Sequence, residues 1–208
     1  MNTLTDSTKQ DIDSTKQKRT KKNNELKLNT SAFRKFAMHN GFIKMVSPKA
    51  IDEMRRYLKN YLLVPIVEEI TEFIKFTMSG KSQKSFRIVQ IDKLKTIIQK
   101  HILHDIDESV EIQNDTIVSK KHKDFAFHPL TFRKYIIQLT EEISRVKNIQ
   151  WSSKCMEMLQ IIIEHELYII MDTCGKVLNG NSNESRKGNL KLTKKDVCFV
   201  FEARYNKR

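Results

Sequence analysis

The chain has few of the residues that build catalytic and cofactor sites. Its 208 residues include five glycines, three prolines and three cysteines. No phosphate loop, Gly-x-Gly-x-x-Gly, His-Glu-x-x-His or Cys-x-x-Cys pattern occurs, and five glycines leave little backbone for a nucleotide cradle. These absences argue against an enzyme, and we expect neither a cofactor nor a metal site.

Two clusters of potentially reactive side chains bear on this expectation. His101 and His104 are three residues apart on a predicted helix and could share a metal, but no third ligand stands at close spacing. The run 164–166, Glu-His-Glu, falls on a predicted long helix with no nucleophile near it in sequence. We interpret that run as a solvated helix face.

Cysteine usage and hydropathy also exclude several classes. Cys155, Cys174 and Cys198 are widely spaced in apolar helical contexts, which predicts buried free thiols in a reducing compartment. No apolar run approaches the roughly 18 residues of a membrane span, and the N-terminus has no signal-peptide core. We therefore expect no membrane partner.

Positive charge is what the chain has in excess. Its 38 Lys and Arg against 25 Asp and Glu give a net charge of +13, which points to a polyanion and most often to nucleic acid. Residues 1–30 are polar, lack aromatics and repeat Asp-Ser-Thr-Lys-Gln, which predicts a disordered tail. Its cations suit either a solubilising tail or a basic arm that lies on phosphate. An acidic and then basic stretch, 105–128, is typical of a linker.

The stretch 47–76 organises the first half. Its apolar residues recur every three or four positions, which predicts one helix from Pro48 to about Phe76, capped by Ser47. We expect Pro65 to kink this helix without breaking it, because the apolar period continues through it. Short helices are predicted around 33–37 and over 91–102, and short strands over 42–46 and 86–89.

The same order of elements returns about 105 residues later. Short helices are predicted over 130–143 and after Thr193, strands over 149–151 and 190–192, and a long helix over 153–177. Trp151, in a strand before an apolar helix, is expected in the core. An internal repeat of this kind predicts an all-helical chain of two similar units.

This layout resembles the histone fold, and short sequence matches strengthen the resemblance. Residues 33–47 resemble the first helix and loop of histone H-four, and 88–92 its second loop. Residues 130–132, 151–153 and 192–196 resemble histone H-three. Two such halves on one chain are similar to the histone doublets of large DNA viruses. The first half fits histone H-two-B nearly as well, through residues 46–51.

The resemblance implies two tandem histone folds, over 31–104 and 129–208, paired intramolecularly in a handshake. In that arrangement each first loop meets the other unit's second loop and, with the first helices, contacts DNA phosphates. The DNA-binding candidates are Arg34, Lys35, Lys44, Arg87, Arg133, Lys134, Gln150, Lys191 and Lys194. Met45 and Gln150 stand where the family inserts arginines into the minor groove, so we expect weaker, more salt-sensitive wrapping.

The implied partners are double-stranded DNA, a second copy of the chain and a companion doublet similar to histones H-two-B and H-two-A. The candidates for self-association are Val177, Asp196, Phe199 and Glu202. The implied function is DNA packaging in a virion, a viral factory or a host nucleus. Two alternatives remain open at this point: a regulatory histone-fold subunit that binds DNA locally, and a helical enzyme or adaptor that is merely basic.

Overall fold

The computed structural model describes residues 26–77, 87–102, 125–144, 149–180 and 190–205. These residues are mostly helical, which confirms the all-helical fold class. Several predictions concern residues outside the described ranges. They are the tail up to residue 25, residue 86 of the second predicted strand, His104, and the linker up to residue 124.

The described elements follow the order short helix, strand, long helix, strand, short helix twice along the chain, and we call the two runs the first and the second unit. The first unit consists of α1 (Thr30–Met38), β1 (Ile43–Val46), α2 (Pro48–Tyr57), the π-helix η1 (Leu58–Leu63), α3 (Val64–Thr77), β2 (Arg87–Ile88) and α4 (Ile91–His101). The second unit consists of α5 (Pro129–Ser144), β3 (Ile149–Gln150), α6 (Ser153–Gly180), β4 (Leu190–Leu192) and α7 (Lys194–Tyr205).

The first long helix begins where predicted but contains a π-helical segment. Ser47 caps α2, and its Oγ accepts a hydrogen bond from Ala50 N at 3.2 Å. In η1 the turns are wider, and the N–H of Val64 donates to the carbonyl of Lys59, five residues earlier. A proline ring clashes with the carbonyl four residues before it in a regular α-helix. The wider turn accommodates Pro65, so the backbone remains helical across it.

The second long helix extends further than its apolar spacing predicts. That spacing indicated an end near Val177, whereas α6 continues to Gly180. After the following loop, the N–H and hydroxyl of Thr193 both donate to Asp196 Oδ2, at 2.8 and 2.6 Å. These bonds fix the first turn of α7 and confirm its predicted start.

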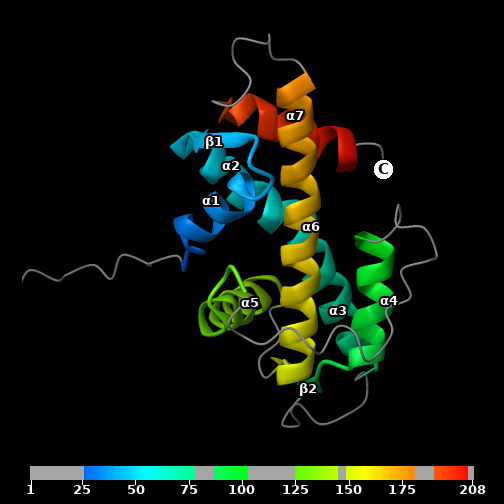
Figure 1. The fold of residues 1–208 in the computed structure, drawn as a ribbon. Coiled ribbons are helices and arrows are strands. Elements are labelled where there is room, and N and C mark those ends of the chain that lie inside the picture. The colour runs from blue at the N-terminus through cyan, green and yellow to red at the C-terminus, as the bar shows by residue number, and fades with distance from the viewer. Residues whose placement is uncertain (1–25, 78–86, 103–124, 145–148, 181–189, 206–208) are drawn as a thin grey trace, which may run out of the picture.

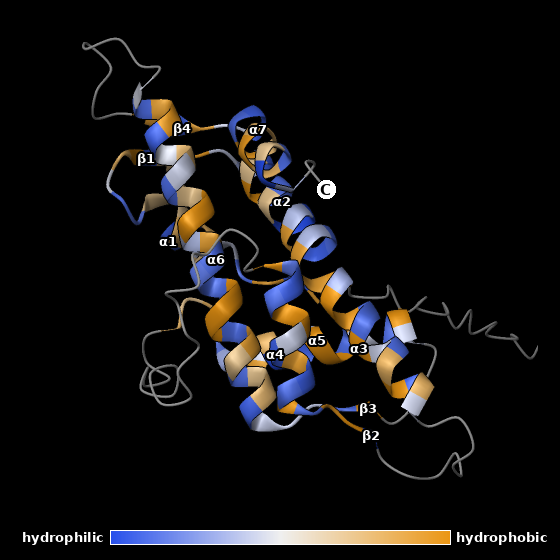
Figure 2. Ribbon diagram, turned by 90° about the vertical axis from the view of Figure 1, so that its right-hand side faces the viewer, coloured by the Kyte–Doolittle hydropathy of each residue, from blue (hydrophilic) through white to orange (hydrophobic). Residues whose placement is uncertain are grey.

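The short strands pair between the two units. β1 lies parallel to β4, with Met45 opposite Lys191, and β2 lies parallel to β3, with Ile88 opposite Gln150. Figure 2 shows β1 beside β4 at one end of the molecule and β2 beside β3 at the other. Parallel strands require long connections between them. Each pair therefore ties the first unit to the second at a separate point.

The helices also pack reciprocally across the two units. α6 contacts α1 and α4, while α2 contacts α7 and α3 contacts α5. In Figure 1, α6 runs along the length of the molecule with these helices beside it. On the stripe of the first long helix, Met54, Leu58 and Leu62 are fully buried in a hydrophobic cluster that includes both units.

Two segments assigned to the tail and the linker belong to this core. Leu28 is 3% exposed, and its carbonyl accepts a hydrogen bond from Arg55 Nε at 3.3 Å. Phe127 is 1% exposed and its ring lies 5.3 Å from that of Phe33 and 5.2 Å from that of Phe36. The packed part of the chain therefore begins before residue 30 and resumes before residue 129.

The predicted solvated face on α6 is wrong for its two glutamates. Glu164 is buried and accepts hydrogen bonds from two backbone N–H groups just before α5, at 2.8 and 3.0 Å. Glu166 is 1% exposed and accepts from Arg204 Nε at 2.6 Å and from the hydroxyl of Tyr205. Buried carboxylates are stable only with such partners. The two residues hold the start and the end of the second unit against α6.

Candidate nucleic-acid interface

The β1–β4 end gathers exposed lysines around two helix starts. Lys44 on β1 and Lys191 on β4 are exposed, and the N–H of Ser47 donates to the carbonyl of Leu192 at 3.1 Å. α2 begins two residues after the end of β1, and α7 begins two residues after the end of β4. Helix N-termini carry partial positive charge and free N–H groups that suit phosphate oxygens. This end therefore combines fixed dipoles with cations.

Two lysines at this end were not singled out from the sequence. Lys49 in the first turn of α2 and Lys195 in the first turn of α7 are both exposed. The signal that could have found them is their position, since each follows a predicted N-cap by two residues.

The β2–β3 end has a similar arrangement with fewer described cations. The N–H of Val89 donates to the carbonyl of Gln150 at 2.9 Å, and α4 and α6 begin just beyond the strands. Arg87 is half-buried, and its Nε is buried without a hydrogen-bond partner among the described residues. The side chain of Gln150 is exposed. Arg87 therefore has one buried donor that is unsatisfied among the described residues, and such a donor is energetically costly.

The first helices present a third group of candidates. Arg34 and Lys35 on α1 and Arg133 and Lys134 on α5 are all exposed. The structure does not gather all the candidates into one cluster. Figure 1 shows α1 and α5 beside the middle of α6, between the end with β1 and the end with β2. The candidates are therefore distributed along the molecule, as an extended polyanion would require.

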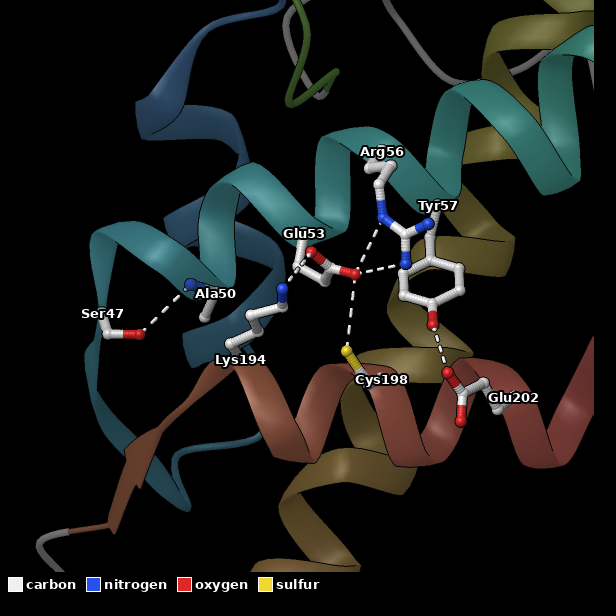
Figure 3. Close-up of polar contacts among 8 residues, drawn as sticks. All are labelled: Ser47, Ala50, Glu53, Arg56, Tyr57, Lys194, Cys198 and Glu202. Atoms are coloured by element: carbon white, nitrogen blue, oxygen red, sulfur yellow. Dashed lines mark hydrogen bonds and ion pairs between the residues drawn. The ribbon is translucent and has the colours of Figure 1, made fainter.

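Lys194 differs from the other candidates because it already has an anionic partner. Its Nζ lies 3.6 Å from Glu53 Oε2, while its side chain stays 57% exposed (Figure 3). Glu53 is buried and also accepts hydrogen bonds from Arg56 and from the Cys198 thiol. Burial alone would raise the pKa of Glu53, but these bonds outweigh it and hold the pKa below its ordinary value. The negative charge of Glu53 therefore partly cancels the attraction that Lys194 would exert on a phosphate.

Glu53 makes a buried contact between the two units that sequence reasoning missed at this end. It links α2 of the first unit to α7 of the second, through Cys198 and Lys194 (Figure 3). Nearby, the hydroxyl of Tyr57 donates to Glu202 at 3.0 Å. Nothing in the spacing of α2 indicates this role, because the partners lie on a distant helix. The buried Glu53 therefore connects α2 to α7 beneath the exposed lysines of this end.

The four candidates for self-association lie on α6 and α7 but differ in exposure. Phe199 is 61% exposed, whereas Val177 and Asp196 are half-buried. Asp196 caps α7, and the exposed Glu202 accepts the bond from Tyr57. Two of the four therefore have roles within the chain. Phe199 is the one with a large apolar surface open to solvent.

The described residues also bear on three other predictions, which concern a metal site, the position of Trp151 and a membrane span. His101 Nε2 lies 2.8 Å from Glu69 Oε2, and no group of three or more metal-ligating side chains is present among the described residues. Trp151 is buried and donates to Thr140 Oγ1 at 3.0 Å, which confirms its predicted core position. Within the described ranges, no helix is both long and apolar enough to cross a membrane.

Comparison with known proteins adds no identification. No family model, no curated protein and no solved structure matches this chain. The arrangement of the residues themselves therefore carries the functional argument.

Proposed function

We propose that the chain is a fused pair of histone folds, of the kind found as doublets in large DNA viruses, that packages double-stranded DNA. The observation that carries this proposal is the reciprocal pairing of the strands. Each unit's first strand lies beside the other unit's second strand, β1 with β4 and β2 with β3. Exposed lysines stand on β1 and β4, exposed cations stand on the first helices, and the half-buried Arg87 stands on β2.

The physical mechanism is neutralisation of phosphates along a bent path. A net charge of +13 and dispersed exposed lysines favour release of counterions from DNA, which is independent of base sequence. Helix N-termini at both strand pairs add N–H donors for phosphate oxygens. The proposal includes a bent path for the DNA over these contact points, and the cost of bending depends on the DNA sequence. Such binding tolerates any sequence that bends at low cost.

Assembly and location follow from the same proposal. A second copy would join through α7 and the end of α6, where Phe199 is exposed. A companion doublet similar to histones H-two-B and H-two-A would extend the particle. The protein would act in a virion, a viral factory or a host nucleus.

The proposal is tested by reversing charge at one strand pair. Lys44→Glu and Lys191→Glu remove two exposed cations that have no structural partner among the described hydrogen bonds and ion pairs. Each should weaken binding to a random-sequence duplex by about tenfold. Each should also reduce the slope of log affinity against log salt concentration by about 1, the equivalent of one phosphate contact. Lys75→Glu, an equal change of charge at an exposed residue of α3, is the matched control. Equal affinity of all three variants, with unchanged folding, would refute the interface.

The same titration separates packaging from local regulation. A packaging protein should bind several unrelated duplexes with similar affinity. A regulatory histone-fold subunit should prefer one sequence by a large factor. Binding that is confined to one selected sequence would therefore favour the regulatory alternative.

A further inference from the structure

Two large apolar side chains are exposed on the strand pairs themselves. Met45 on β1 is 53% exposed and Ile88 on β2 is 61% exposed. The remaining apolar residues of the described strands are buried or half-buried. In register, Met45 faces Lys191 across one pair, and Ile88 faces Gln150 across the other. Each end of the molecule therefore presents an outward pair of one apolar and one polar side chain.

The neighbouring charges indicate what these apolar side chains contact. Lys44 directly precedes Met45 and Arg87 directly precedes Ile88 on the same strands. Lysines are depleted from the cores of protein–protein interfaces, because their desolvation is unfavourable. Met45 has Lys44 before it and Lys191 opposite it, and Ile88 has Arg87 before it. An apolar group beside a cation suits a polyanion that also has an apolar part. Duplex DNA is such a partner, with phosphates at its edge and stacked bases inside.

We propose that Met45 and Ile88 are wedges that enter the minor groove and partly unstack base steps, so that the duplex kinks at two points. This inference rests on the proposed function. Methionine and isoleucine are among the apolar side chains that insert between base steps in proteins that bend DNA. Lys44 and Arg87 would hold the phosphates beside each opened step. Unstacking costs a few kcal/mol per step, and the larger protein surface that the bent duplex reaches offsets this cost.

The fold also sets the minimum distance between the two kinks. The strand pairs lie at opposite ends of α6 (Figure 1), which has 28 residues. A helix of that length is about 40 Å long. At about 3.4 Å per base pair, this corresponds to about 12 base pairs of straight DNA. Pyrimidine–purine steps kink most easily, so two TA steps about 12 or more base pairs apart should be bound best.

The experiment uses the full chain and compares polar substitutions of matched size. The variants are Met45→Gln, Ile88→Gln, the double variant and Phe76→Gln. Phe76 is 82% exposed near the end of α3, on a helix rather than on a strand, and serves as the control. Three quantities are measured on an end-labelled duplex of about 40 base pairs, a length that spans the whole protein. They are affinity at two salt concentrations, energy transfer between the ends, and permanganate oxidation of thymines at TA steps.

The wedge proposal predicts a specific combination of results. Wild type should bring the duplex ends closer and make thymines reactive. The double variant should bind about tenfold more weakly, leave the duplex straighter and protect the thymines. Its salt dependence should equal that of wild type, because every cation remains. Phe76→Gln should behave as wild type in all three measurements.

Other results separate the two proposals. If the double variant binds, bends and unstacks DNA like wild type, the wedge proposal is wrong and the proposed function stands. If Phe76→Gln loses as much as the double variant, the effect is not specific to the strand pairs, and the wedge proposal is again wrong. If wild type itself does not bind any duplex, the proposed function fails, and the wedge proposal fails with it.

Discussion

Asn40 of the first unit lies against Gly175 in α6 of the second unit. A Cβ atom at position 175 would stand 2.1 Å from Asn40 Nδ2, much closer than van der Waals contact allows. Asn40 Oδ1 accepts a hydrogen bond from Phe42 N at 3.1 Å, and its Nδ2 lies 3.4 Å from Asp172 Oδ1. The turn that leads into β1 is therefore positioned on α6 by one asparagine.

This contact predicts that Gly175→Ala destabilises the protein. The added methyl group must displace Asn40, and overpacking of this kind costs about 1–3 kcal/mol of unfolding free energy. Gly180→Ala is the matched control, because a Cβ there meets nothing within 4 Å. It should be neutral or slightly stabilising, since alanine favours helices. Urea denaturation of both variants measures the difference, and equal stabilities would show that Asn40 does not occupy this position.

A second prediction concerns the buried Glu166. Glu166→Gln keeps the shape of the side chain but leaves the Arg204 guanidinium without its anion. Breaking a buried pair in this way should cost about 3 kcal/mol of unfolding free energy. Glu202→Gln, at an exposed residue that accepts one hydrogen bond from Tyr57, should cost less than about 1 kcal/mol. If both variants unfold at the same denaturant concentration, Glu166 does not hold α7 to α6.

Two carboxylates predict how stability depends on pH. Burial alone would raise the pKa values of Glu53 and Glu69, but hydrogen bonds from Arg56 to Glu53, and from Lys100 and His101 to Glu69, outweigh it. Both pKa values therefore lie below the ordinary 4.5. The unfolded chain binds these protons more tightly than the folded protein. The stability these residues contribute is thus fully present above pH 4.5 and is lost as pH falls through the folded pKa values.

The measurement is the unfolding free energy between about pH 7 and about pH 3, a range that contains the carboxylate titrations. Wild type should lose stability on acidification. The variant with Glu53→Gln and Glu69→Gln should be less stable at neutral pH and lose less on acidification, so that the two curves approach each other. Parallel curves would show that neither carboxylate is linked to folding.

The sequence predicted the order of elements well because each signal was local. Ser47 before a proline and Thr193 before an aspartate three residues on mark helix starts through bonds within one turn. Apolar spacing marked the two long helices for the same reason. The end of α6 was missed because its last residues, Asn179 and Gly180, resemble loop residues. The π-helix was not predicted, because Pro65 indicates strain in a helix but does not indicate how the backbone relieves that strain.

The errors about charge have a different cause. Glu164 and Glu166 looked solvated on their own helix, yet their partners lie before α5 and at the end of α7. Glu53 likewise depends on Cys198 and Lys194 of the other unit. Helical spacing reports which face a residue occupies and does not report which distant cation covers it. The exposed candidates such as Lys44 could be predicted because exposure requires no partner.

The measurement that tests the central proposal most directly is limited micrococcal nuclease digestion of the protein on random-sequence DNA at two salt concentrations. We predict a discrete protected length on unrelated sequences, which is lost as salt rises, because phosphate contacts along a fixed path carry the binding. Absence of protection at either salt concentration, or protection of one selected sequence only, would contradict packaging by this chain.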